Sequence, residues 1–326
     1  MNELADLCTV LSSRNRIFIQ THNFPDHDAI ASAFALQYLL EKREIPGTII
    51  YAGEIQRRSL IRLIEELAIP VFREGNCPRT EEDQIIIVDG CKGNKNVTDL
   101  IGDEVAVIDH HNVVSPDEVA YTDIRPAYGA CSTIMHEYFR DDNIEIPRTV
   151  ATALLTGLLV DTALMTRGVC RADLEAYAEL YVRADVPFVN SLLRNKIQQK
   201  ELAFYRYVIE NVRVQYDFAF CYFAEGCNQN LLGIIGDFLL GLSEVDFVFL
   251  CARNNGAVNF SVRSEVPYWN AAAVIQQVLQ GTGFGGGHSD MAGGLIENHQ
   301  LFDEGRIFRQ LQDLLQSKKR AKGRGK

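Results

Sequence analysis

Four apolar segments of the chain each run into a carboxylate or an imidazole, and this recurrence constrains the fold more than any other feature. The segments lead, in order, into His22, Asp26 and Asp28; into Asp89; into Asp109, His110 and His111; and into Asp161. Strand-like and helix-like segments alternate along the first half, which predicts an α/β domain with a mostly parallel sheet flanked by helices. The carboxyl ends of such strands meet in one crevice, so we expect side chains spread over about 140 residues to converge there.

The stretch THNFPDHDAIAS, residues 21–32, places three of these side chains where an apolar run gives way to a predicted helix. Pro25 stiffens the turn between His22 and Asp26. Asp28 is expected to start the helix, so that backbone N–H groups and the helix dipole face the same place. The segment alone is equally typical of an acidic surface turn with a capping Asp. The repetition elsewhere favours a metal site, with His27 facing solvent.

The chain has 326 residues, of which 47% are hydrophobic, and is longer than the chains that usually fold around a single hydrophobic core. Two domains are therefore expected. The pattern predicts a catalytic α/β domain over residues 1–184 and a linking helix within residues 185–210. A smaller α/β domain follows over residues 211–317, and residues 318–326 form a basic tail that we expect to be disordered.

The net charge of −11 sits on a chain whose last ten residues carry six Lys or Arg, so the body is strongly acidic. Such a body does not attract a long nucleic-acid duplex, although a local basic pocket can bind a small phosphate compound. Eight cysteines without a CxxC pair are typical of reduced, mostly buried thiols. No signal peptide is recognisable, and the longest apolar run, residues 150–160, is too short to span a membrane. We therefore expect a cytoplasmic protein without a membrane partner.

In order and rough spacing, the four ligand-bearing segments resemble the motifs of the DHH-superfamily phosphoesterases of the DHH–DHHA1 type, which include nanoRNases and dinucleotide phosphodiesterases. The resemblance implies one divalent ion on His22, Asp26 and Asp89, and a second on Asp28, Asp89, His110 and Asp161, with Asp89 bridging. It also implies that Asp109 orients neighbouring ligands and that His111 faces the substrate phosphate. Mixed imidazole and carboxylate ligation favours manganese, and two cations would offset the repulsion among four carboxylates.

A glycine cluster near the C-terminus, GTGFGGGH, contains GxGxxG, but a helical pattern precedes it where a dinucleotide-binding fingerprint needs a strand. Followed by Ala292-Gly293, the GGGH run resembles the signature of DHHA1 domains, which close over the metal site and grip the substrate in the cleft between the domains. The substrate-binding residues implied are Arg263, Ser264, Gly286, Gly287 and His288. For Arg263, a surface salt bridge is the simpler alternative.

The sequence thus predicts a two-metal phosphodiesterase that hydrolyses linear diribonucleotides such as pGpG or pApA, and very short oligoribonucleotides, to mononucleotides. A 3′-phosphoadenosine 5′-phosphate phosphatase and a cyclic-dinucleotide phosphodiesterase are alternative enzymes. A nucleotide-binding sensor that retains the fold is the alternative outside catalysis. Base preference, a possible homodimer and the role of the basic tail stay open at this stage.

Overall fold

The structure, a computed structural model, describes residues 3–11, 15–55, 57–194, 197–266 and 268–323, with side chains up to residue 314. The chain divides into two compact units, unit 1 (Met1–Lys196) and unit 2 (Ile197–Lys326). The expected linking helix over residues 185–210 is two helices instead. Helix α7 (Val186–Arg194) belongs to unit 1, and helix α8 (Leu202–Asn211), preceded by the 3-10 turn η2 (Gln199–Glu201), belongs to unit 2.

Unit 1 is built on a sheet that, within the described part of the chain, has six strands in the order β3-β2-β1-β4-β5-β6. All neighbours in this sheet pair in parallel, with Ile19 opposite Ile49 in β2 and Ile86 in β4. The strands are β1 (Ile17–Thr21), β2 (Gly47–Tyr51), β3 (Val71–Arg73), β4 (Gln84–Val88), β5 (Asp103–Asp109) and β6 (Tyr121–Ile124). From β1 the chain builds outward to one edge through β2 and β3, then returns to β4 and builds to the other edge. The order therefore reverses between β1 and β4, where ligands bind in open α/β sheets.

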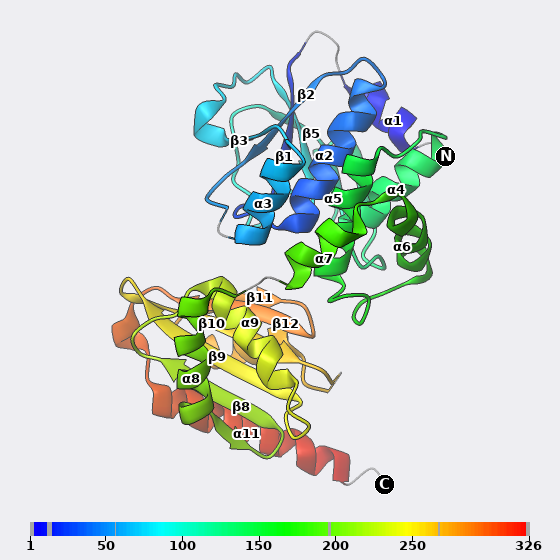
Figure 1. The fold of residues 1–326 in the computed structure, drawn as a ribbon. Coiled ribbons are helices and arrows are strands. Elements are labelled where there is room, and N and C mark those ends of the chain that lie inside the picture. Colours follow the sequence, from blue (N-terminus) through cyan, green and yellow to red (C-terminus); the bar gives the residue numbers. More distant parts are fainter. Residues whose placement is uncertain (1–2, 12–14, 56, 195–196, 267, 324–326) are drawn as a thin grey trace. The chain divides into compact units, whose positions relative to one another are not determined.

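The helices of unit 1 cover one face of this sheet, with α2 and α5 prominent beside the strands (Figure 1). Ile17, Ile19, Ile86 and Ile108 point to that face, because alternate side chains of a strand point to opposite sides. The helical and 3-10 elements not yet named are α1 (Glu3–Val10), α2 (His27–Glu41), α3 (Arg58–Glu66), η1 (Glu74–Asn76), α4 (Cys131–Asp141), α5 (Arg148–Asp161) and α6 (Arg171–Arg183).

The other face of the sheet is covered by irregular chain. Phe18, Ile85 and Ile87 pack there against Cys91 and Val97 of the connection between β4 and β5. Parallel strands are usually joined through a helix. The described residues between β4 and β5 contain none. The irregular segment after β4 instead packs on the sheet and contacts the chain that follows β1, where the Asn23 N–H donates to the Asn96 carbonyl.

Unit 2 contains a mixed sheet of six described strands in the order β11-β12-β10-β9-β8-β7, in which only β8 and β9 pair in parallel. The strands are β7 (Arg213–Gln215), β8 (Phe218–Phe223), β9 (Phe247–Asn254), β10 (Ala257–Ser264), β11 (Phe284–Gly287) and β12 (Met291–Ile296). Two separate apolar clusters lie on its faces: one includes residues of α10 (Ala271–Leu279) and α11 (Glu304–Gly323), the other residues of α8 and α9 (Gln229–Leu240). A 3-10 turn, η3 (His299–Leu301), precedes α11. The α/β class predicted for both halves is confirmed.

Helix α11 extends to Gly323, so residues 318–323, which we expected to be disordered, are helical; the rest of that expected tail lies outside the described residues. The glycine cluster supplies strand β11, and residues 121–124 form strand β6. Among the described residues, no helix combines the length and the apolar character that crossing a membrane requires.

Candidate metal centre

The first ligand group lies at the carboxyl ends of the neighbouring strands β1 and β4. His22 Nε2 is 3.9 Å from Asp26 Oδ1 and 3.7 Å from Asp89 Oδ2, so one ligand atom from each residue faces a common point. The other ring nitrogen, His22 Nδ1, lies 2.9 Å from the Asn23 carbonyl oxygen and donates to it. In the neutral ring, this hydrogen bond keeps the proton on Nδ1 and leaves a lone pair on Nε2, as a metal ligand requires.

Asp26 has a second role as the N-cap of α2. Its Oδ1 accepts hydrogen bonds from the backbone N–H groups of Asp28 at 3.0 Å and Ala29 at 3.2 Å. Asp26, rather than Asp28, therefore caps the helix, and Asp28 lies within the first turn. This corrects the sequence-based expectation, because α2 begins at His27, two residues earlier than a helix capped by Asp28 would begin.

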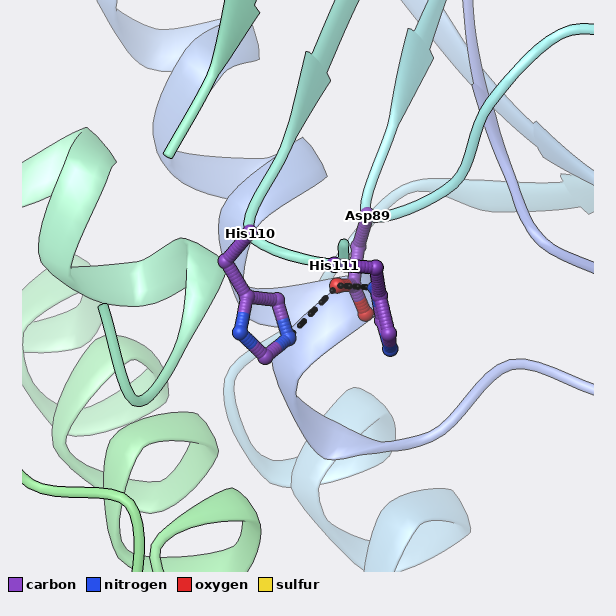
Figure 2. A group of neighbouring side chains, drawn as sticks. All are labelled: Asp89, His110 and His111. Carbon is purple, nitrogen blue, oxygen red and sulfur yellow. Dashed lines mark ion pairs between the residues drawn. The ribbon is translucent and has the colours of Figure 1, made fainter. Parts of the chain in front are cut away.

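The second ligand group joins Asp28 with His110, which follows β5, and Asp161, the last residue of α5. His110 Nε2 is 3.2 Å from Asp161 Oδ2 and 3.4 Å from Asp89 Oδ1. His110 Nδ1 donates to the Tyr128 carbonyl oxygen at 3.2 Å, which directs Nε2 to the carboxylates. Figure 2 shows the rings of His110 and His111 on either side of the Asp89 carboxylate, with Asp89 Oδ1 3.8 Å from His111 Nδ1.

Asp28 is held by the amino end of α4. Its Oδ2 accepts from the Cys131 N–H at 2.6 Å, and its Oδ1 accepts from the Ser132 N–H at 3.0 Å and from the Ser132 hydroxyl. Gly157 of α5 makes room for this arrangement, because a Cβ at that position would lie 2.5 Å from Ser132 Oγ and 2.8 Å from Asp28 Oδ1. Burial and the nearby charges of Asp89 and Asp161 raise the pKa of Asp28 well above its usual range.

Asp89 belongs to the first ligand group and also to a third, which it forms with His110 and His111. His110 belongs to the second and third groups, so Asp89 and His110 together connect the two halves of the centre. Its backbone adopts φ 57°, in the left-handed region that Asp tolerates better than most residues. Burial raises its pKa to about 6, against the opposing charges of His110 and His111. For His22, burial disfavours the charged ring, but the carboxylates of Asp26 and Asp89 prevail and raise its pKa to about 10. For His110, burial acts the same way, and Asp161 and Asp89 prevail to raise its pKa well above the usual value.

The residues fit a pair of divalent cations. Asp89 Oδ1 and His110 Nε2 are buried and form no hydrogen bond with any described residue, although buried polar atoms nearly always find a partner. Four carboxylates and two imidazoles with fixed tautomers form a ligand set of the kind that manganese accepts. Asp161 ends α5, where the negative end of the helix dipole also favours a cation.

Asp109 and His111 form a pair beside the ligand groups. His111 Nδ1 is 2.7 Å from Asp109 Oδ1, and the same oxygen accepts from the His111 backbone N–H at 3.1 Å. Burial disfavours the charged ring, but the hydrogen bond with Asp109 outweighs it and raises the pKa of His111. Asp109 is fully buried, so it orients His111 from behind, whereas the side chain of His111 is 31% exposed.

His27 is not exposed as expected; it is 3% exposed, and its Nε2 lies 2.9 Å from the Ser59 hydroxyl of α3. Packing of α3 over the start of α2 buries it, which no local pattern indicates. Three further groups that shape the site were not predicted: Ser132, Gly157 and the Tyr128 carbonyl. Only Gly157 gave a signal, since an isolated glycine within an apolar helical run usually marks a close approach.

The expected substrate-binding residues lie in unit 2. Arg263 packs along α9: its Nε donates to Asp237 Oδ1 at 2.8 Å, and the side chain is 11% exposed. The Ser264 hydroxyl is buried and donates to the Val266 carbonyl oxygen at 3.1 Å, so it serves the turn after β10. Gly286 leaves open space where a Cβ would stand, Gly287 has φ 140°, and His288 is exposed.

The fold and the centre together define a protein of two α/β domains in which carboxylates and imidazoles cluster, as metal ligands do, at a sheet's switch point. Residues 16–158 match the DHH family, N-terminal domain, and residues 211–317 match the DHHA1 domain. The chain therefore belongs to the DHH-superfamily phosphoesterases and carries both a DHH and a DHHA1 domain, as the sequence motifs indicated.

Several known proteins are similar to this chain. An uncharacterized protein of Methanocaldococcus jannaschii is 29% identical over 86% of this chain and 58% of its own length. A probable manganese-dependent inorganic pyrophosphatase of Streptococcus thermophilus is 30% identical over 52% of this chain and 55% of its own length. The chain thus spans about half the length of the curated relatives it matches. A crystal structure of an exopolyphosphatase-related protein from Bacteroides fragilis shares the fold, with a TM-score of 0.78 and 17% identity over 97% of this chain and 96% of that one.

Proposed function

We propose that the protein is a manganese-dependent phosphodiesterase that hydrolyses linear diribonucleotides, and very short oligoribonucleotides, to mononucleotides. One observation carries the proposal: two ligand groups, His22–Asp26–Asp89 and Asp28–His110–Asp161, lie side by side, with Asp89 Oδ1 only 3.4 Å from His110 Nε2. Two divalent ions held this way lower the pKa of bound water and stabilise charge on the entering and leaving oxygens of a phosphoryl group.

The remaining chemistry falls to His111. Its Nδ1 is occupied by Asp109, which leaves Nε2 to carry the transferable proton. Hydrolysis of a diribonucleotide forms a bond between a water oxygen and phosphorus and breaks the bond from phosphorus to the ribose 3′ oxygen. The water loses a proton to solvent, and His111 donates one to the departing oxygen. Although burial disfavours the charged ring, the hydrogen bond with Asp109 raises the pKa of His111 and so favours the protonated form that acts as this donor.

The choice of substrate rests on charge and domain content. A net charge of −11 disfavours long nucleic acid, whereas the presence of a DHHA1 domain in addition to the DHH domain supports a substrate larger than pyrophosphate. Inorganic pyrophosphate is a second candidate, because the streptococcal relatives are described as probable pyrophosphatases. The alternatives from the sequence also stand: 3′-phosphoadenosine 5′-phosphate, cyclic dinucleotides, and binding without turnover. A homodimer is compatible with each of them.

Product analysis tests these functions directly. The protein, loaded with manganese, is incubated with pGpG, pApA, a cyclic dinucleotide, 3′-phosphoadenosine 5′-phosphate, longer RNA and pyrophosphate. We expect mononucleotides from the linear dinucleotides at the highest kcat/KM. Faster release of phosphate from pyrophosphate would replace the proposal with a pyrophosphatase. Dinucleotide that is bound but unchanged after long incubation would identify a sensor.

A further inference from the structure

Phe24 stands between two residues of the candidate metal centre, in the loop that joins β1 to α2. It follows His22 by two residues and precedes Asp26 by two, so its backbone lies within about 7 Å of both. Pro25 beside it is buried, whereas Phe24 is 57% exposed. An exposed aromatic ring at this position requires an explanation, because the loop otherwise serves to hold ligands.

The backbone of Phe24 is held in a conformation that phenylalanine disfavours. Its φ is 54°, in the left-handed region where a bulky side chain is an outlier. Hydrogen bonds fix the loop on both sides: the Phe24 N–H donates to the Ala52 carbonyl at 3.0 Å, and the Asn23 N–H donates to the Asn96 carbonyl at 2.6 Å. The Asn23 side chain also accepts from the N–H and hydroxyl of Thr98. Strain of this kind persists where the surrounding structure enforces it, often at functional sites.

Gly53, which follows β2, supports the ring from one side. A Cβ at Gly53 would lie 3.0 Å from Cδ1 and from Cε1 of Phe24, so the ring rests directly on the glycine backbone. Gly53 also lines a hollow of about 450 Å³ in unit 1, whose apolar lining includes Ile55, Ile61, Ile64 and Val71. The Gly53 backbone thus supports the ring on one side, more than half of the side chain is exposed, and an apolar hollow adjoins the supporting residue.

We infer that Phe24 is a specificity-determining residue that stacks a nucleobase of the substrate while the phosphodiester lies at the metal centre. The inference rests on the proposed function and narrows it to substrates that carry a base. Base–aromatic stacking tolerates any base, and its loss corresponds to roughly a tenfold change in affinity. Because hydrogen bonds already fix the loop that carries the ring, Phe24 loses little conformational freedom when a base binds. This advantage accounts for a strained backbone at this position.

The test is a cycle of two enzymes and two substrates. The enzymes are the full chain and Phe24→Asn; the substrates are pApA and the same dinucleotide with one base removed, the abasic position being placed at either end in turn. We expect Phe24→Asn to raise the KM for pApA about tenfold with little change in kcat. For one of the two abasic substrates, the variant and the natural enzyme should then have equal KM, because the stacked base is already missing.

The unfolding temperature of the Phe24 variants distinguishes a role in base stacking from a structural role. Asn tolerates a positive φ better than Phe does, so Phe24→Asn should unfold at the same or a higher temperature than the natural chain. Phe24→Trp keeps an aromatic face and should restore the KM, and Phe24→Leu serves as the aliphatic variant if Phe24→Asn folds poorly. Phe72→Ala, which removes an exposed ring of the same unit from β3, is the matched control and should leave the KM unchanged.

The outcomes separate the inference from the proposed function. If the natural enzyme cleaves none of the dinucleotides, the proposed function fails and Phe24 has no such substrate. If the natural enzyme cleaves pApA but Phe24→Asn and Phe24→Leu match its KM, only the role of Phe24 is overturned. The role of Phe24 is also overturned if Phe24→Asn raises the KM for both abasic substrates as much as it raises the KM for pApA.

Discussion

At the level of single residues, Asp89 combines an unusual backbone with a buried charge. Its left-handed φ of 57° turns the chain at the end of β4 so that both carboxylate oxygens face ligands, one toward His22 and the other toward His110. No other described acidic residue belongs to two of the ligand groups. Losing this carboxylate therefore affects both halves of the centre at once.

We predict that Asp89→Asn keeps the fold but loses manganese binding and turnover. Asn tolerates the left-handed backbone, so the change removes the charge without adding strain. Since loss of even an outer partner of a ligand costs about 10–100-fold, we expect activity to fall by at least about 100-fold. Thermal unfolding with and without manganese checks the binding, and Asp117→Asn, at an exposed position, is the control. Undiminished activity in Asp89→Asn would rule out its shared role.

The raised pKa values of the histidines predict that manganese uptake releases protons. His22, with a pKa of about 10, holds a proton at pH 7.5 in the metal-free protein, and a metal requires the neutral ring. Uptake at saturating manganese should therefore release about one proton from His22, with a further contribution from His110. The apparent affinity for manganese should rise with pH. Calorimetry in two buffers of different ionisation enthalpy counts the protons. His22→Asn should lower the count by about one, whereas His299→Asn should not change it.

At the level of elements, the sequence predicted what local patterns determine. Strands β1, β4 and β5 were placed correctly because each contains a continuous apolar run. The convergence of His22, Asp89 and His110 followed from parallel strands ending at one edge. Strand β6 was missed because it lies at the sheet's edge and is only partly buried. Strand β11 consists mostly of glycine, a weak strand former, and exists because it pairs with β12. Such tertiary contacts have no local signature.

Helices α2 and α5 pack closely where Gly157 meets Asp28. This contact predicts whether Gly157→Ala stabilises or destabilises the protein. In an isolated helix, Gly→Ala stabilises by about 1 kcal/mol. Here the added methyl group would lie 2.8 Å from Asp28 Oδ1, so we expect Gly157→Ala to destabilise unit 1 by about 1–3 kcal/mol and to weaken manganese binding.

Chemical denaturation with and without manganese measures both effects of Gly157→Ala. Gly305→Ala in α11 is the matched control, because its added Cβ would meet neighbours only at 3.4 Å, an ordinary contact. We expect no loss of stability in the control. A stabilised Gly157→Ala protein that binds manganese normally would show that α2 and α5 can separate without disturbing Asp28.

At the level of the whole molecule, each unit has its own apolar cores, and the described ligand groups lie entirely in unit 1. Units with separate cores are expected to unfold as separate cooperative blocks. A ligand stabilises the block that binds it, by about 2.7 kcal/mol at a concentration of 100 Kd. Manganese should therefore act on unit 1 and leave the unfolding of unit 2 unchanged.

The sequence provides a reporter for this prediction, because its single tryptophan, Trp269, is fully buried in the core of unit 2. Tryptophan fluorescence then follows unit 2, whereas far-UV circular dichroism follows both units. At 100 Kd of manganese, we expect the circular dichroism to show one transition raised by about 5–10 °C. The fluorescence transition should stay within about 1 °C, and Asp89→Asn should abolish the shift. An equal rise in both signals would mean that the two units unfold together, so that metal bound in unit 1 also protects the core around Trp269.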